Sequence, residues 1–248
     1  MLMLFEKNWK KRCGFELEEI KPYRFTERID RYGWMQDHKN NWHYTLFVEN
    51  GRVTDESSVP LKTALLKIAE TEKVVFRFTS NQNLIISDIS ASNKQSVEDI
   101  LRYYGILQRD ESIAAIRKNA IACVALPTCP LALAEAQRYL PELITKIEPL
   151  LDKYGLAEED IIIRMTGCPN GCARPYAAEI GLVGTSPGHY NLHIGGDREG
   201  TRLNTRFREQ LNEEAILKEL DHLFEQYASR RHVYGSFGDF SEKEILHV

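Results

Sequence analysis

Residues 73–88 read KVVFRFTSNQNLIISD, in which two runs of β-branched and aromatic residues flank a polar tetrapeptide. Runs of this composition are typical of β-strands. The intervening segment, residues 80–83, has the small polar side chains that are typical of a turn. The stretch therefore predicts two strands, Lys73 to Thr79 and Leu84 to Asp88, joined in a hairpin.

A second hairpin is predicted upstream of this one. Trp42 to Glu49 is rich in aromatic and β-branched residues, and Asn50-Gly51 is a strong signal for the tight turn of a hairpin. We expect Arg52 to Asp55 to return as the partner strand.

Each hairpin is followed by a helical pattern. Ser58 is a predicted N-cap with Pro60 in the first turn, and the apolar residues that follow recur at helical spacing. Ser96 to Tyr104 is a second predicted helix, which ends at Gly105. We therefore expect residues 36–108 to form a ferredoxin-like α+β half-domain of order β-β-α-β-β-α, with the strands on one side and both helices on the other.

The rest of the chain differs from this unit. Residues 1–35 mix charged and aromatic side chains without sustained periodicity, and we expect a leader or linker there. Residues 109–248 are expected to form an α/β domain. Its predicted strands are 120–126, 161–166, 180–184 and 190–194, and its predicted helices are 130–140, 141–154 and 212–229.

The composition argues against several classes of function. Of 248 residues, 32 are Lys or Arg and 36 are Asp or Glu, and no basic patch alternates with aromatic residues, so nucleic-acid binding is not expected. No run approaches the roughly 18–20 apolar residues that span a bilayer, so no membrane segment is expected. The first residues lack the pattern of a signal peptide, and the odd number of cysteines favours reduced thiols. We therefore expect a cytoplasmic protein.

Four of the five cysteines form two spaced pairs. Cys123 and Cys129 have five residues between them, Cys168 and Cys172 have three, and each pair lies at or just after an apolar run that predicts a strand. Two such pairs favour a metal site over ordinary buried cysteines. An iron–sulfur cluster fits better than zinc, which usually takes tighter pairs in small modules, although structural zinc stays an alternative. Cys13 is assigned no role.

The cysteine motifs resemble the paired signature of the siroheme sulfite and nitrite reductases. The first motif is CVALPTCPLA at 123–132, and the second is TGCPNGC at 166–172. The resemblance covers most of the chain and extends to YGW at 32–34, WHYTLFVENG at 42–51, SNQNL at 80–84, YNLHIGG at 190–196 and GDF at 238–240. The part that this chain matches is the C-terminal half of a hemoprotein of that family.

The resemblance implies two redox cofactors. In that family the four cysteines ligate a 4Fe-4S cluster and the last one also binds the iron of siroheme, so Cys172 is the implied catalytic residue. The implied reaction is the six-electron, assimilatory reduction of sulfite to sulfide. The implied partner is a separate flavoprotein (alpha) component that draws on NADPH, because this sequence has no G-x-G-x-x-G fingerprint after a predicted strand.

Siroheme is rich in carboxylates, so its pocket needs cationic and amide side chains. Arg198, Arg202 and Arg206 recur at helical spacing and are as compatible with a solvated helix face as with cofactor contacts. The polar side chains of residues 81–83 are also explained by an ordinary turn between two strands, without a cofactor. The predicted cofactor-binding residues are Asn81, Gln82, Asn83, Arg164, Asn170, Arg174, Arg198, Arg202 and Arg206.

The sequence departs from the family pattern in one respect. Hemoproteins of that family consist of two similar halves, and the basic residues that bind the sulfite anion come from the N-terminal half, which these 248 residues lack. We therefore expect a fragment, a split-gene product or a truncation that reduces little or no sulfite by itself. Nitrite reduction by the same scaffold and a non-catalytic, zinc-binding interaction module are the alternatives.

Overall fold

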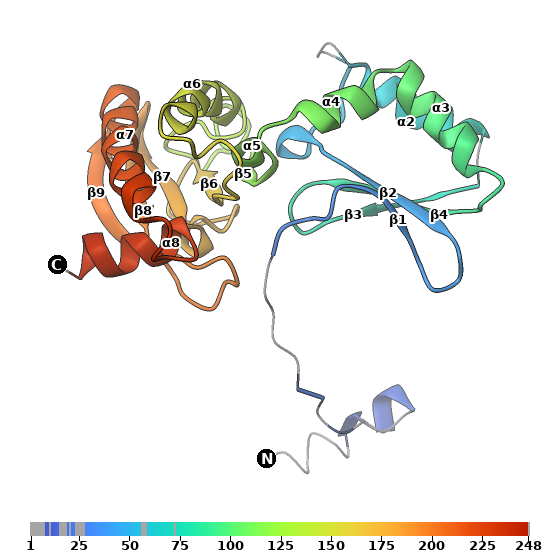
Figure 1. Ribbon diagram of the computed structural model, residues 1–248, viewed down its shortest axis with the longest axis horizontal. Helices are drawn as coiled ribbons and strands as arrows, with labels where there is room; N and C mark the ends of the chain where they lie inside the picture. The colour runs from blue at the N-terminus through green and yellow to red at the C-terminus, as the bar shows by residue number, and fades with distance from the viewer. Residues whose placement is uncertain are drawn as a thin grey trace.

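The computed structural model describes residues 8–9, 11–14, 19, 21–22, 28–55, 59–71 and 73–247. The strands form a four-stranded and a five-stranded sheet, which lie in separate parts of the ribbon (Figure 1). Each sheet has its own cluster of buried apolar side chains. Among these residues, no helix combines the length and the apolar character needed to cross a lipid bilayer. The predicted cap Ser58 and part of the predicted leader lie outside the described residues.

The first sheet is antiparallel, with strand order β1-β2-β4-β3. Its strands are β1 (Gly33–Gln36), β2 (Trp42–Leu46), β3 (Val75–Phe78) and β4 (Leu84–Ile89). Helices α2 (Leu61–Thr71) and α3 (Lys94–Tyr103) cover one face of this sheet (Figure 1), where Leu46, Ile68 and Ile86 are fully buried. The order β-β-α-β-β-α is observed, but its first strand, β1, comes mostly from the predicted leader at residues 1–35, which is therefore wrong at this end. The hairpin within residues 73–88 is confirmed.

The upstream hairpin differs from the prediction. Strand β2 pairs with β1 across a turn at residues 37–41, whereas residues 52–55 form no strand. Asn50 and Gly51 do adopt positive φ, as their residue types predict, but they lie in the short 3-10 helix η1 (Glu49–Gly51). The reason is a tertiary contact, because the buried Asn50 side chain donates to the Gln137 carbonyl oxygen at 3.0 Å and so holds this turn against the second sheet's unit.

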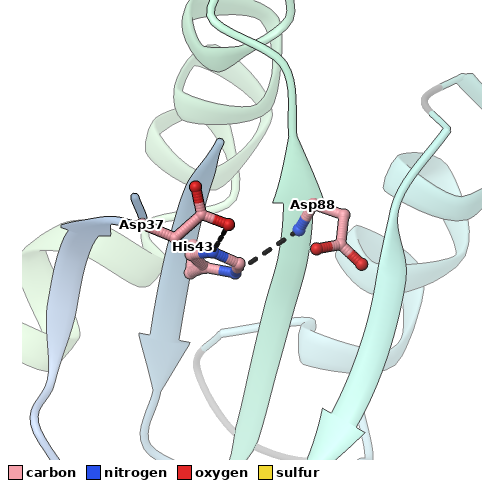
Figure 2. A group of neighbouring side chains, drawn as sticks. All are labelled: Asp37, His43 and Asp88. Carbon is pink, nitrogen blue, oxygen red and sulfur yellow. Dashed lines mark hydrogen bonds and ion pairs between the residues drawn. The ribbon is translucent and has the colours of Figure 1, made fainter. Parts of the chain in front are cut away.

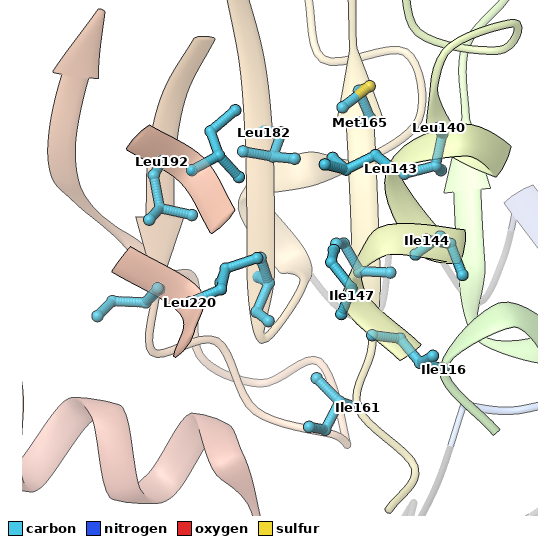
Figure 3. Packing of buried hydrophobic residues seen from close by; sticks show 14 of the residues in the cluster. Ile116, Leu140, Leu143, Ile144, Ile147, Ile161, Met165, Leu182, Leu192 and Leu220 are labelled. Carbon is cyan, nitrogen blue, oxygen red and sulfur yellow. The ribbon is translucent and has the colours of Figure 1, made fainter. Parts of the chain in front are cut away.

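The second sheet has strand order β5-β6-β7-β8-β9, in which β5, β6 and β7 are parallel and the remaining pairs are antiparallel. Its strands are β5 (Ala120–Ala122), β6 (Ile163–Thr166), β7 (Ile180–Ser186), β8 (His189–Ile194) and β9 (Thr205–Leu211). Helices α6 (Leu140–Lys153) and α7 (Glu213–Arg230) share its apolar core. Figure 3 shows Leu143 and Ile147 of α6 and Leu220 of α7 in the same layer as Leu182 and Leu192 of the sheet.

The predicted helix at 130–140 is wrong, since residues 123–139 form turns and α6 begins only at Leu140. The N–H groups of Leu133 and Ala134 donate to the Gly167 carbonyl oxygen at 2.7 and 3.0 Å. Backbone groups that a helix would pair internally are therefore bound to the next loop. The strand predicted at 120–126 also ends early, at Ala122, because the chain turns at Ala125 with φ 47°.

Shorter elements complete the fold. They are α4 (Ile106–Ser112), α5 (Ala115–Lys118), η2 (Pro175–Ala177), α8 (Phe237–Phe240) and the π-helix η3 (Ser241–Leu246). The helices predicted at 96–104, 141–154 and 212–229 and the strands predicted at 161–166, 180–184 and 190–194 are confirmed, with ends that differ by a few residues.

Candidate functional site

The two cysteine motifs follow neighbouring strands. Strands β5 and β6 run parallel with Ala122 opposite Met165, so the segments that follow them leave from the same edge of the sheet. Cys123 comes directly after β5, and its N–H donates to the Met165 carbonyl oxygen at 3.1 Å. Beyond β6, the Gly167 N–H donates to the Cys123 Sγ atom at 3.3 Å. The first cysteine of one motif therefore contacts the residue directly before the first cysteine of the other.

Gly167 makes this close approach possible. A Cβ atom on Gly167 would lie 2.5 Å from the Ala134 carbonyl oxygen and 2.7 Å from the Ala125 Cβ atom. The Thr166 hydroxyl donates to the Cys168 carbonyl oxygen at 3.1 Å and holds the turn that follows. The two loops are thus packed backbone against backbone, and only glycine fits at their crossing.

The four thiols on these loops are free. Cys168 is buried, Cys123 and Cys129 are half-buried, and Cys172 is exposed. Burial raises the pKa of the Cys123 thiol and the nearby Cys172 and Cys168 raise it further, whereas the Gly167 N–H lowers it. Four unpaired thiols on adjoining loops are a donor set that fits an iron–sulfur cluster. They fit a single tetrahedral zinc ion less well, because no three of the four sulfur atoms lie within 4.8 Å of one another.

Three arginines lie close together beside these loops. Arg164 of β6 is 1% exposed, and its Nε atom has no hydrogen-bond partner among the described residues. Its Nη1 atom donates to the Arg174 carbonyl oxygen at 3.4 Å. Burial, together with the like charges of Arg174 and Arg28, lowers the pKa of Arg164 to about 9. A buried cation with an orphaned donor fits an anionic ligand, as the carboxylates of a siroheme are.

Comparison with known proteins identifies the family. Residues 35–104 match the nitrite/sulfite reductase ferredoxin-like half domain. The chain is 58% identical over 236 residues to the sulfite reductase (NADPH) hemoprotein beta-component of Leptospira biflexa and 48% identical over 237 residues to that of Dickeya chrysanthemi. These matches cover 95% and 96% of this chain. This chain belongs to the nitrite/sulfite reductase family.

Solved structures agree with this family at the level of the fold. The NirA protein of Mycobacterium tuberculosis superposes on 97% of the chain with a TM-score of 0.75 at 21% sequence identity. A dissimilatory sulfite reductase superposes on 84% of it with a TM-score of 0.57 at 10% identity. The predicted α+β class with a ferredoxin-like half-domain is confirmed. The chain spans 42% of the Leptospira relative, 41% of the Dickeya relative and 45% of the NirA chain.

The family resemblance predicts cofactor contacts from the turn between β3 and β4, and this turn lies at the cysteine edge. The Gln82 Nε2 atom donates to the carbonyl oxygen of Ala122, the residue before the first cysteine, at 2.9 Å. The Asn81 Nδ2 atom donates to the Arg28 carbonyl oxygen at 2.8 Å. The Asn83 Oδ1 atom instead accepts a backbone N–H of its own unit at 2.9 Å. Asn81 and Gln82 therefore adjoin the site, while Asn83 supports the turn.

Asn170 and Arg174 lie on the second cysteine loop itself. Asn170 is exposed between the last two cysteines. Arg174 has φ 58°, and its Nη2 atom donates to the Ser80 carbonyl oxygen at 2.5 Å. Both residues are thus within a few positions of the thiols, and Arg174 also connects this loop to the turn of the first unit.

The three other arginines predicted from the family do not join Arg164. Their helical spacing is misleading, because Arg206 lies in strand β9 and the residues before it form turns. Each has a carboxylate partner of its own, although the buried Nε atom of Arg198, like that of Arg164, has no hydrogen-bond partner among the described residues. The pairs are Arg198 with Glu159 at 3.5 Å, Arg202 with Asp239 at 2.7 Å and Arg206 with Glu209 at 2.9 Å.

Sequence reasoning missed the segment 28–32, which lies before the first strand. The Asp30 Oδ2 atom accepts from the Thr79 hydroxyl at 2.6 Å, and the Tyr32 hydroxyl donates to the Lys118 carbonyl oxygen at 2.8 Å. This segment therefore contacts both units beside the cysteine edge. Its residues show no periodicity, and the only signal was Tyr32, which begins the YGW motif of the family resemblance.

A second group of ligand-type side chains lies at the β1–β2 hairpin (Figure 2). Ligand atoms of Asp37, His43 and Asp88 lie within 4.8 Å of one another. Both ring nitrogens of His43 are already used: Nδ1 accepts the Asp88 N–H at 3.4 Å, and Nε2 lies 3.3 Å from the Asp37 Oδ2 atom. The Asp88 carboxylate pairs with Arg77 at 2.9 Å. These contacts assign the group to holding the hairpin.

Proposed function

We propose that this chain is the cluster- and cofactor-binding part of an assimilatory sulfite reductase hemoprotein. Cys123, Cys129, Cys168 and Cys172 hold a 4Fe-4S cluster in this proposal, and Cys172 also binds the iron of siroheme. The observation that carries it is the contact between the two cysteine loops, in which the Gly167 N–H donates to the Cys123 Sγ atom. The exposure of Cys172, alone among the four, supports a second bonding partner for that thiol.

The side chains around the loops have complementary tasks. Arg164 and Arg174 neutralise carboxylates of the cofactor, and the amides of Asn81, Gln82 and Asn170 line the same edge. The Gly167 N–H, aimed at sulfur, stabilises the thiolate form of Cys123 and so adjusts the potential of a bound cluster. When bound, the cluster would relay electrons from a separate donor, and the siroheme iron would bind the sulfite that receives them.

The proposal includes partners that this chain does not contain. Relatives are named as the beta-component of an NADPH sulfite reductase, which supports a separate flavoprotein alpha-component as electron donor. The remainder of the relatives' length supports a further half of the hemoprotein, which would bind the sulfite anion. We propose a cytoplasmic location and little or no sulfite turnover by these residues alone. The expected divisions at residues 35 and 108 fall inside β1 and α4, so the boundaries of the units lie outside these two elements.

Anaerobic purification of the chain, followed by assays of iron, labile sulfide and tetrapyrrole, tests the proposal. We expect iron and sulfide in the chain itself, and their loss in a Cys168→Ser variant. A Cys13→Ser variant is the matched control, because Cys13 is exposed and remote in sequence from the loops. Zinc without iron or sulfide would favour the interaction-module alternative, and a folded, metal-free protein would favour ordinary core cysteines.

Nitrite reduction is the second candidate, since the matched half domain is common to nitrite and sulfite reductases. The substrate is distinguished by the complete hemoprotein with its electron donor. We expect a higher kcat/KM for sulfite than for nitrite, and the reverse ranking would replace the proposed substrate while leaving the cofactor assignment in place.

A further inference from the structure

We propose that Tyr176 is the positioning residue of Cys172, because its side chain holds the loop that joins Cys168 to Cys172. The inference rests on the proposed function, in which the Cys172 thiol is shared between the cluster and the siroheme iron. It assigns a task to a residue that lies outside both cysteine motifs and that no pattern in the sequence singles out.

The backbone between these two thiols has little support of its own. The internal hydrogen bond from the Gly171 N–H to the Cys168 carbonyl oxygen is long, at 3.5 Å. Pro169 has no N–H to donate, and Gly171 has φ +69°, a conformation that glycine adopts without strain. Cys172 directly follows Gly171, so the position of its thiol depends on a conformation that the loop alone holds weakly.

Tyr176 supplies a contact from outside this loop. It lies in η2, four residues after Cys172. Its hydroxyl group donates to the Pro169 carbonyl oxygen at 3.0 Å. Its ring lies against Gly171, since a Cβ atom on Gly171 would be 3.0 Å from the Tyr176 Cε2 atom and 3.3 Å from its Cδ2 atom. One aromatic side chain therefore contacts the loop on both sides of Asn170.

The second sheet in turn holds Tyr176 in place. The His193 ring of β8 packs edge-on against the Tyr176 ring, with 5.3 Å between the centroids and 76° between the planes. The Tyr176 carbonyl oxygen accepts the Asn204 N–H at 2.8 Å. The Asn204 side chain donates to the carbonyl oxygens of Pro175 at 2.7 Å and Ala178 at 2.9 Å. Ring and backbone are thus both fixed, so Tyr176 can transmit the position of the sheet to the cysteine loop.

Tyr176 differs from the tyrosines that stabilise the core. Tyr190 and Tyr227 are buried in the apolar cluster of the second sheet, whereas Tyr176 is half-buried and belongs to neither apolar cluster. Its contacts go to the cysteine loop on one side and to His193 on the other. Removing the ring should therefore loosen the loop more than the fold. Loop position alters the hydrogen bonding and the solvent exposure of a bound cluster, which set its potential.

Alkylation of the metal-free full chain with iodoacetamide, measured for each cysteine by mass spectrometry, tests the inference without a cofactor. Cys168 is 8% exposed, so its thiol reacts only when the loop opens. We expect Cys168 to react at least tenfold faster in Tyr176→Ala than in the unmodified chain, with the rate of Cys123 on the other loop unchanged. Tyr176→Phe, which keeps the ring and loses only the hydrogen bond, should raise the Cys168 rate about two- to tenfold.

The matched control is Tyr103→Ala, because Tyr103 lies in the first unit and is 82% exposed. It should leave every alkylation rate unchanged. Equal increases at Cys168 and Cys123 in Tyr176→Ala would show a general loss of stability, and unchanged rates at both would show that the ring does not hold the loop. Either result would overturn the inference.

The reduction potential of the cluster in the loaded chain is the second readout, since a tyrosine that serves only the fold would not change it. In Tyr176→Phe we expect a higher potential at unchanged iron and sulfide contents, because a looser loop admits water, which stabilises the more negatively charged reduced cluster. An unchanged or lower potential would overturn the inference. A chain that binds no iron would reject the proposed function instead, and the alkylation rates would still decide whether Tyr176 holds the loop.

Discussion

The cysteine loops and the Asp37–His43–Asp88 group both gather side chains that can bind metals, but their donor atoms differ in availability. At the hairpin, both ring nitrogens of His43 are hydrogen-bonded and the Asp88 carboxylate is paired with Arg77. At the loops, backbone groups such as the Gly167 carbonyl hold the structure together, the four thiols form no disulfide, and the Cys123 Sγ atom accepts the Gly167 N–H. The comparison indicates that the availability of donor atoms, as well as residue type, separates a candidate binding site from a structural cluster.

The largest effect is expected from Gly167→Ala, which would separate the two cysteine loops. The new Cβ atom has no space beside the Ala134 carbonyl oxygen and the Ala125 Cβ atom. We expect the free energy of unfolding to fall by about 3 kcal/mol, the upper end of typical overpacking costs, and bound iron to be lost. Urea unfolding and iron analysis measure both.

The matched control is Gly235→Ala, since a Cβ atom at Gly235 has no neighbour within 4 Å and its φ is not in the left-handed region. It should retain stability and iron. If Gly167→Ala matched this control, the tight crossing of the loops would not be what holds the thiols together.

A smaller effect is expected from His43→Ala, which removes the centre of the hairpin group. The Asp88 N–H loses its acceptor and Asp37 loses one donor, so we expect a loss of about 1–2 kcal/mol in urea unfolding. Iron content should stay that of the unmodified chain. Loss of a bound zinc or other divalent ion from His43→Ala, in metal analysis of chain purified without chelators, would show that this group does bind metal and would break the comparison.

The sequence predicted most strands and placed each cysteine pair on a loop after a strand, because these features depend on neighbouring residues. The β3–β4 hairpin follows from β-branched runs, and the thiols of each pair lie on one loop. The failures share a cause in tertiary contacts. Asn50 has the predicted backbone conformation, yet its side chain binds Gln137 and not a partner strand's turn. Arg28 was missed because only the folded chain brings it beside Arg164.

The pH dependence of unfolding tests whether the Asp37–His43–Asp88 group stabilises the hairpin. Although desolvation opposes the shift, N–H groups of Asn41 and Lys39 and the His43 ring hold the pKa of Asp37 at about 2, below its ordinary 3.8. A depressed carboxyl pKa adds stability that is present above the unfolded pKa and is lost as pH falls through the folded one. As the pH falls from about 4 to 2, the free energy of unfolding should therefore decrease more in the unmodified chain than in Asp37→Asn, which has no carboxyl group to protonate at this position. Parallel slopes of the two unfolding curves in this window would contradict the shift.

The smallest effect is expected from Arg77→Ala, which frees the Asp88 carboxylate at the hairpin. Arg77 and Asp88 are 52% and 38% exposed, and exposed ion pairs contribute about 0.2–1 kcal/mol. Arg52→Ala is the control, because Arg52 is exposed and has no ion pair among the described residues. The informative readout is zinc affinity by calorimetry. In Arg77→Ala both His43 nitrogens keep their hydrogen-bond partners, so we expect it to bind zinc no more tightly than Arg52→Ala does. Tighter zinc binding by Arg77→Ala would mean that the Arg77–Asp88 salt bridge, and not the hydrogen bonds of His43, prevents metal binding.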